Sequence, residues 1–176
     1  MVSEMTTPMR LQGPGSFHVY TVATGGAPFF GDDLDRQTFV ERLGRIAARS
    51  GWRVYAYCLM TTHYHAVVET GSANLSRGMQ RLNAGHVQLF NQRWERSGTL
   101  VARRFGYRVI ESEEYLGGAC RYVWLNPVRA GLCLAAADWP WSGGEWFDSI
   151  YSLRGWTWPC ATCPGPRPPR TVTPAA

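Results

Sequence analysis

The sequence predicts an α+β fold in which helices pack on one face of an antiparallel β-sheet. Residues typical of strands gather in four segments, at 17–23, 53–59, 63–70 and 99–110. Between them, apolar residues recur three and four positions apart, which is typical of helices. The order strand-helix-strand-strand-helix-strand, followed by a third helix, is that of a ferredoxin-like domain, the arrangement that RRM and palm domains share.

The first two helices have clear signals in the sequence. Asp32, Asp33 and Asp35 crowd the start of the first, where carboxylates suit the positive end of the helix dipole. This helix is expected to end near Gly51. The second helix carries His86 on its apolar stripe, so His86 is interpreted as a core or groove residue and not as a metal ligand.

A third helix is predicted after Glu114. It should stop before Pro127, because the residue that precedes a proline is pushed out of the helical region. Tyr122 and Asn126 are four positions apart and therefore lie one above the other on one face of this helix. Taken alone, Tyr122 would be an ordinary core aromatic.

Composition favours an ordered globular protein with an anionic partner. The chain has 176 residues, 45% of them hydrophobic, which is enough for one domain with a buried core. All eighteen basic residues are arginine, against thirteen acids, for a formal net charge of +5. The guanidinium group matches phosphate geometry, so a polyanion is the expected partner. A GC-rich genome would produce the same arginine usage, so the positions of the arginines carry more weight than their type.

The chain divides into three parts. Residues 1–15 read as a flexible lead-in, 16–150 as one folded domain, and 151–176 as an irregular tail rich in Trp and Pro. The sequence shows neither a signal-peptide segment nor a run of eighteen apolar residues, so a cytoplasmic protein without a membrane partner is expected. Five cysteines fit reduced thiols, and Cys160 with Cys163 has zinc-knuckle spacing without a second pair.

The only closely spaced histidines are His63 and His65. On a strand they point the same way, so two imidazoles would face one point in space, an arrangement suited to a divalent cation. Two histidines that merely line a half-buried sheet face would give the same spacing.

A cluster of arginines begins near the start of the second predicted helix and continues to residue 108. Trp94, Phe105 and Tyr107 lie among these arginines. A groove that binds single-stranded nucleic acid needs both kinds of residue, because positive charges contact the phosphates and aromatic rings stack on the bases. An ordinary solvated face would instead carry both signs. Between residues 77 and 108 there is one acid, Glu95, and seven arginines: Arg77, Arg81, Arg93, Arg96, Arg103, Arg104 and Arg108.

Two strings resemble a known family. One is His63-Tyr64-His65 after a hairpin strand, and the other is Tyr122-Val-Trp-Leu-Asn126-Pro-Val-Arg-Ala-Gly131-Leu. Together they resemble the HUH single-tyrosine transposases, most closely the REP-associated tyrosine transposases. The similarity runs from about residue 17 to residue 146.

The chain departs from that family at two positions. Thr61-Thr62 stands where relatives have Pro-Asn before the first histidine, and Thr24-Gly25 stands where their first strand ends in Arg-Gly. Neither change touches a residue that the resemblance implies as a ligand or nucleophile.

The resemblance implies a transposase that cuts and rejoins single-stranded DNA at hairpin or palindromic repeats. Tyr122 would be the nucleophile of a 5′-phosphotyrosine intermediate, and His63, His65 and Asn126 would bind Mg²⁺ or Mn²⁺. The enzyme would act as a monomer or homodimer in the bacterial cytoplasm, on the nucleoid when bound to DNA. The arginines expected to contact DNA are Arg77, Arg81, Arg103, Arg104, Arg108 and Arg129.

Two other functions remain open from the sequence. One is a non-catalytic single-stranded nucleic-acid binder, in which Tyr55 and Tyr57 on the second strand would stack on bases. The other is a metal-dependent nuclease that uses activated water in place of tyrosine. Only the transposase would leave a covalent link between protein and DNA.

Overall fold

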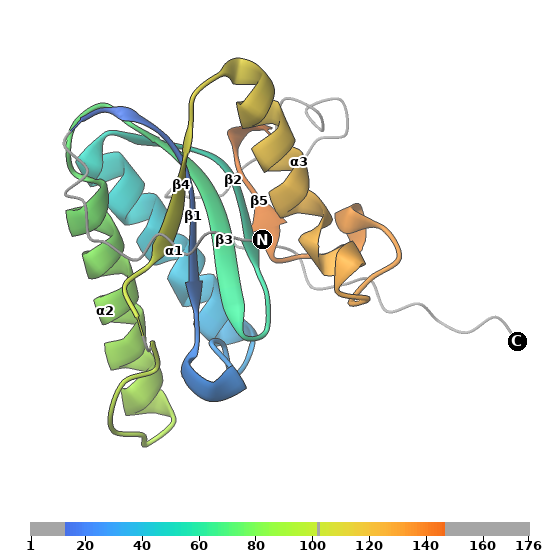
Figure 1. Cartoon of the computed structure of the whole chain (residues 1–176). Helices are drawn as coiled ribbons and strands as arrows, with labels where there is room; N and C mark the ends of the chain where they lie inside the picture. The colour runs from blue at the N-terminus through green and yellow to red at the C-terminus, as the bar shows by residue number, and fades with distance from the viewer. Residues whose placement is uncertain (1–12, 102, 147–176) are drawn as a thin grey trace, which may run out of the picture.

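The computed structural model describes residues 13–101 and 103–146, which form a five-stranded antiparallel sheet with three α-helices (Figure 1). The predicted α+β class is confirmed. The elements are β1 (Gly15–Val22), the 3-10 turn η1 (Thr24–Gly26), α1 (Asp33–Ser50), β2 (Trp52–Leu59), β3 (His63–Thr70), α2 (Leu75–Arg93), β4 (Gly106–Ile110), α3 (Glu113–Arg129), the 3-10 turn η2 (Ala136–Asp138) and β5 (Ser142–Gly143). The strand order is β4-β1-β3-β2-β5.

Some expectations fall outside the described residues. These are most of the predicted lead-in, at 1–12, and the whole of the predicted tail at 151–176 with Cys160 and Cys163. No helix in the described part of the chain is long and apolar enough to cross a membrane.

The helices cover both faces of the sheet (Figure 1). α1 and α2 share one core with Tyr64, whereas α3 packs through Cys120 and Val123 against Val67 in a second core. The expected packing on one face therefore holds for α1 and α2, but α3 lies on the opposite face. The physical reason is strand alternation: successive residues of β3 point to opposite faces and both faces are largely buried, so each side needs its own cover.

Two element boundaries differ from the prediction. α3 continues through Pro127 to Arg129, so the proline, which cannot donate a hydrogen bond to the preceding turn, does not stop the helix at once and the helix ends two residues later. The expected strand at 99–110 is shorter: β4 begins at Gly106, and among the described residues before it Val101 forms an isolated bridge with Ala23.

α1 has the boundaries that the sequence suggested. The side chain of Asp32 caps its first turn by accepting the backbone N–H of Asp35 at 3.0 Å. Gly51 ends it in a left-handed conformation, with φ of 66°, and its N–H donates to the carbonyl of Ala47.

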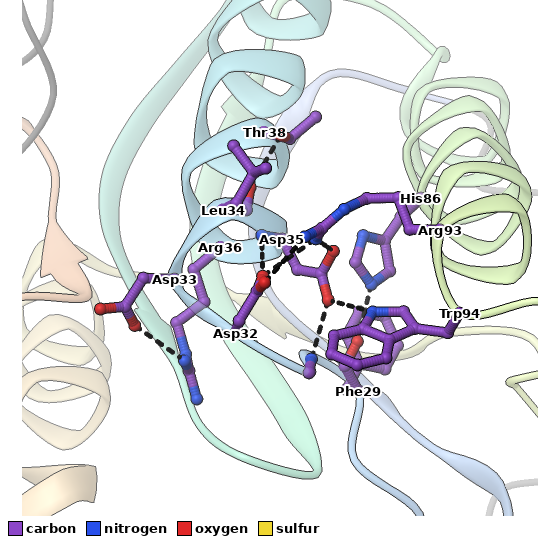
Figure 2. Close-up of polar contacts among 11 residues, drawn as sticks. Phe29, Asp32, Asp33, Leu34, Asp35, Arg36, Thr38, His86, Arg93 and Trp94 are labelled. Atoms are coloured by element: carbon purple, nitrogen blue, oxygen red, sulfur yellow. Dashed lines mark hydrogen bonds and ion pairs between the residues drawn. The ribbon is translucent and has the colours of Figure 1, made fainter.

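A buried carboxylate ties the start of α1 to the end of α2 (Figure 2). Asp35 accepts the backbone N–H of Gly31 at 2.8 Å and the indole N–H of Trp94 at 2.9 Å, and its other oxygen pairs with Arg93. Arg93 also pairs with Asp32 at 2.7 Å. Two carboxylates, one buried and one exposed, thus pair with the partly exposed Arg93.

His86 lies in the same layer and belongs to the core, as interpreted from the sequence. It is buried, its Nε2–H donates to the carbonyl of Phe29 at 2.7 Å, and its ring stacks on the Phe29 ring with centroids 4.7 Å apart (Figure 2). A backbone carbonyl thus accepts the hydrogen bond of the His86 ring, and His86 has a structural role.

Candidate active site

β3 presents two histidines on the sheet face that α3 covers. His63 and His65 share this face, and their ring centroids are 5.1 Å apart with planes at 87°. Tyr64, between them, points into the opposite core and donates its hydroxyl to Asn83 at 2.7 Å. A slip of β3 by one residue would break that buried bond and turn both histidines away.

Tyr122 reaches the histidines from α3. Cys120 and Val123 anchor this helix on the sheet, which leaves Tyr122 at the margin of the contact with 41% of its surface exposed. Its ring centroid is 5.8 Å from that of His65, in an edge-to-face arrangement. The site therefore joins an accessible phenol from the helix to an imidazole pair from the sheet.

A third histidine, His18 on β1, completes the cluster. Its Nε2 lies 3.0 Å from Nδ1 of His65, within hydrogen-bond distance. Its ring centroid is 5.6 Å from that of Tyr122. His18 therefore touches the buried histidine of β3 on one side and the exposed phenol of α3 on the other.

Burial favours the neutral form of the three histidines. Desolvation lowers the pKa of His65 to about 3, with the nearby His18 and His63 adding to the effect. Desolvation and then the charge of Arg108 lower the pKa of His18 to about 4, and desolvation also lowers the pKa of His63. A neutral imidazole keeps a lone pair on one nitrogen, which is the form that binds metal ions.

The two histidines of β3 are each held through Nδ1. The hydroxyl of Thr62 lies 3.1 Å from Nδ1 of His63, and His18 lies 3.0 Å from Nδ1 of His65. Within the described residues, no hydrogen bond involves Nε2 of His63 or of His65. In each ring, Nδ1 contacts a neighbouring side chain, and Nε2 is the nitrogen available to bind a ligand.

Asn126 lies one turn after Tyr122 on α3. Its amide nitrogen donates to the carbonyl oxygen of Tyr122 at 2.9 Å, which leaves its amide oxygen as the acceptor. It forms no hydrogen bond with either histidine of β3 among the described residues. The described residues also contain no group of three or more His, Cys, Asp or Glu side chains that could hold a metal ion.

The arginines expected to bind DNA fall in different layers. Arg108 pairs with His18 across β1 and β4, and Arg129 lies over the ring of Tyr122, so both belong to the α3 side. Arg77 and Arg81 are exposed on α2, in the opposite layer (Figure 1).

Arg103 and Arg104 lie at the sheet edge near the histidines. Val101 bridges to Ala23 and Gly106 pairs with Tyr20, so the exposed residues between them run beside the end of β1. That end of β1 pairs with the start of β3, where His63 stands. The sequence cluster is therefore split by the sheet.

Tyr55 and Tyr57 do not form a common stacking platform. The register of β2 against β3 shifts between Val54 and Ala56, so the two tyrosines face opposite sides of the sheet despite their spacing of two. Tyr57 is buried in the α1 and α2 core, and the hydroxyl of Tyr55 donates to Glu69. This removes the surface on which the binding-only hypothesis depended.

A solved structure has a similar fold. The chain is similar to a REP-associated tyrosine transposase bound to a REP hairpin, with a TM-score of 0.65 over 88% of this chain and 87% of that chain. The fold is that of a REP-associated tyrosine transposase. Sequence identity is 14%, so the similarity concerns the fold.

Other comparisons add no further support. A candidate transposase from Deinococcus radiodurans R1 has a TM-score of 0.46 at 12% identity, over 70% of this chain and 95% of that chain, and at this score the likeness carries no argument. No family profile and no curated protein matches the sequence.

Within this transposase fold, His18 is the site residue that sequence reasoning missed. The signal was a histidine and Tyr20 at a spacing of two on the first predicted strand. Their shared face becomes meaningful only with the pairing of β1 and β3, in which Tyr20 stands opposite His65 and His18 opposite Val67.

Proposed function

We propose that this protein is an HUH-type transposase that cuts and rejoins single-stranded DNA through a 5′-phosphotyrosine at Tyr122. The observation that carries the proposal is the meeting of the exposed Tyr122 ring with the ring of His65, with centroids 5.8 Å apart, in a fold shared with a tyrosine transposase. A nucleophile that must reach a phosphodiester needs such exposure, whereas a core aromatic does not.

The reaction conserves the energy of the phosphodiester. The hydroxyl oxygen of Tyr122 forms a bond to phosphorus, the bond from phosphorus to the 3′-oxygen breaks, the phenol loses its proton and the 3′-oxygen takes one up. The products are DNA linked to Tyr122 through a 5′-phosphate and a free 3′-hydroxyl. Attack by a 3′-hydroxyl reverses these bonds, so strands are rejoined without a nucleotide cofactor.

The residues of β3 fit a divalent cation. Both histidines are neutral, they share one face, and each is held through Nδ1 with Nε2 left over. The amide oxygen of Asn126 would be an oxygen donor of the kind that Mg²⁺ and Mn²⁺ prefer. When bound by His63, His65 and Asn126, the cation would act as a Lewis acid on the scissile phosphate.

Charge around the site supports single-stranded DNA as the substrate. Arg108 and Arg129 lie on the α3 side, and Arg103 with Arg104 stands at the sheet edge beside His63. The structural neighbour is bound to a REP hairpin, which favours a hairpin or repeat as the DNA form recognised here.

The decisive experiment is Tyr122→Phe. The protein would be incubated with single-stranded oligonucleotides from its own flanking repeats and Mn²⁺, with the DNA labelled at its 3′ end. We expect a protein–DNA adduct that resists denaturing detergent in the wild type, and neither adduct nor cleavage in the variant, whose ring and packing are kept. Cleavage by Tyr122→Phe at the wild-type rate would show that water is the nucleophile.

A matched lesion tests the cation site. Replacement of both His63 and His65 by Ala should abolish cleavage together with Mn²⁺ binding, as measured by calorimetry. Tyr122→Phe should bind Mn²⁺ like the wild type. Equal Mn²⁺ affinity in the double variant and the wild type would contradict the assignment of these histidines as ligands.

A further inference from the structure

We infer that His18 is a positioning residue for the active site: its Nε2 accepts the Nδ1–H of His65, which directs the Nε2 lone pair of His65 toward the ligand side. This inference rests on the proposed function, because a cation at the histidines of β3 is part of that function.

The contact between the rings is direct and largely shielded. The nitrogens are 3.0 Å apart, the ring centroids 5.1 Å apart and the planes inclined by 33°. His65 has 9% of its surface exposed, so water has little access to replace the bond. At this distance one of the two nitrogens must carry a hydrogen and the other must offer a lone pair.

The direction of that hydrogen bond decides whether His65 can act as a ligand. A neutral imidazole carries a single N–H. If His65 donates from Nδ1, its Nε2 keeps the lone pair that a cation needs. If His18 donates instead, the hydrogen of His65 sits on Nε2 and blocks it. Acceptance by His18 is the only arrangement compatible with ligation through Nε2.

The place of His18 in the sheet suits it to act as such a partner. His18 lies on the same sheet face as His65, on the strand next to β3, and Arg108 stands opposite it across β1 and β4. His63 is held in a parallel way, since the hydroxyl of Thr62 lies 3.1 Å from its Nδ1. Metal-ligating histidines usually have such a partner on the second nitrogen, and the partner fixes both tautomer and ring orientation.

The position of His18 also links the two halves of the site. Its ring is 5.6 Å from that of Tyr122, so the imidazole that orients His65 packs against the proposed nucleophile. Removal of the His18 ring would therefore loosen both partners. A replacement that keeps bulk and an acceptor is needed to separate the hydrogen bond from packing.

The test compares His18→Phe with His18→Gln in the metal-free protein and with Mn²⁺. The chain has four histidines, so long-range ¹H–¹⁵N spectra resolve each tautomer. We expect His65 to carry its hydrogen on Nδ1 in the wild type and in His18→Gln, whose amide oxygen can accept, and to shift toward Nε2–H in His18→Phe. Mn²⁺ affinity should fall about 10- to 100-fold in His18→Phe and return most of the way to the wild-type value in His18→Gln.

The outcomes separate this inference from the proposed function. A wild-type His65 with its hydrogen on Nε2 would overturn the inference, as would an unchanged tautomer and Mn²⁺ affinity in His18→Phe. A wild type that binds no Mn²⁺ but shows the expected tautomers would refute the cation site and still support the hydrogen-bonding role of His18. Thr62→Val is the matched control: it should alter the spectrum of His63 and leave the tautomer of His65 as in the wild type.

Discussion

The guanidinium of Arg129 lies over the ring of Tyr122, with its Cζ atom 5.0 Å from the ring centroid. Arg129 stands in the last turn of α3, about two turns after Tyr122. A cation over an aromatic ring is attracted by the negative face of that ring. In a cleaving enzyme the same charge would also favour the negative charge that develops on the phenol oxygen.

Arg129→Gln should therefore slow cleavage even when DNA is saturating. An exposed pair of opposite charges contributes about 0.2–1 kcal/mol, and loss of that interaction with the developing phenolate charge corresponds to a rate decrease of up to roughly fivefold. Arg129→Lys should retain most of the rate. Single-turnover cleavage measures this effect apart from binding. A variant with weaker DNA binding but a normal saturated rate would show that Arg129 contacts only phosphate.

The division of the arginines between two layers makes a prediction about DNA affinity. Replacing Arg103 and Arg104 by Ala should weaken binding to all single strands and reduce the slope of log affinity against log salt by about 0.7 for each phosphate that is no longer neutralised. The matched pair Arg77→Ala with Arg81→Ala, on α2, should leave the slope nearly unchanged. A larger effect from the α2 pair would place the DNA on the opposite layer.

The ion pair between Asp32 and Arg93 should make stability depend on acid pH. The hydrogen bond from Arg93 is the main reason that the pKa of Asp32 falls from 3.8 to about 2. A lowered folded-state pKa means that the stabilisation is complete above 3.8 and is lost as the pH falls through about 2. Urea unfolding should therefore show Asp32→Asn less stable than wild type at pH 5, with the difference shrinking toward pH 2. In an Arg93→Gln background the same substitution should have little effect at either pH.

Gly106 lies under the ring of Tyr20, so a larger residue at position 106 is expected to destabilise the fold. A Cβ atom at Gly106 would stand 2.2 Å from Cζ of Tyr20, whose ring centroid is 5.9 Å from that of His65. Gly106→Ala should therefore displace the tyrosine ring and cost about 1–3 kcal/mol, as overpacking does. A double-mutant cycle with Tyr20→Ala in thermal unfolding should show strong coupling. Additive effects would mean that the ring moves freely.

Much of the fold could be predicted because the signals were local. The carboxylates before α1, the glycine after it and the spacing of His63 and His65 depend on a few neighbouring residues, and the structure agrees with each of them. The β-bulge that turns Tyr55 and Tyr57 to opposite faces could not be predicted, because a spacing of two promises a shared face unless an extra residue is inserted in the pairing.

The sequence by itself determined the order of the first four strands and the three helices, the shared face of the β3 histidines and the position of Tyr122 one helical turn before Asn126. Only the tertiary structure decided that α3 covers the face opposite α1 and α2, that Arg77 and Arg81 lie in a different layer from Arg108, and that His18 reaches His65. The physical reason is the distance along the sequence over which each kind of interaction acts. Periodicity and capping act within a turn or a strand, whereas the contact between His18 and His65 spans 47 positions and exists only once β1 and β3 are paired in register.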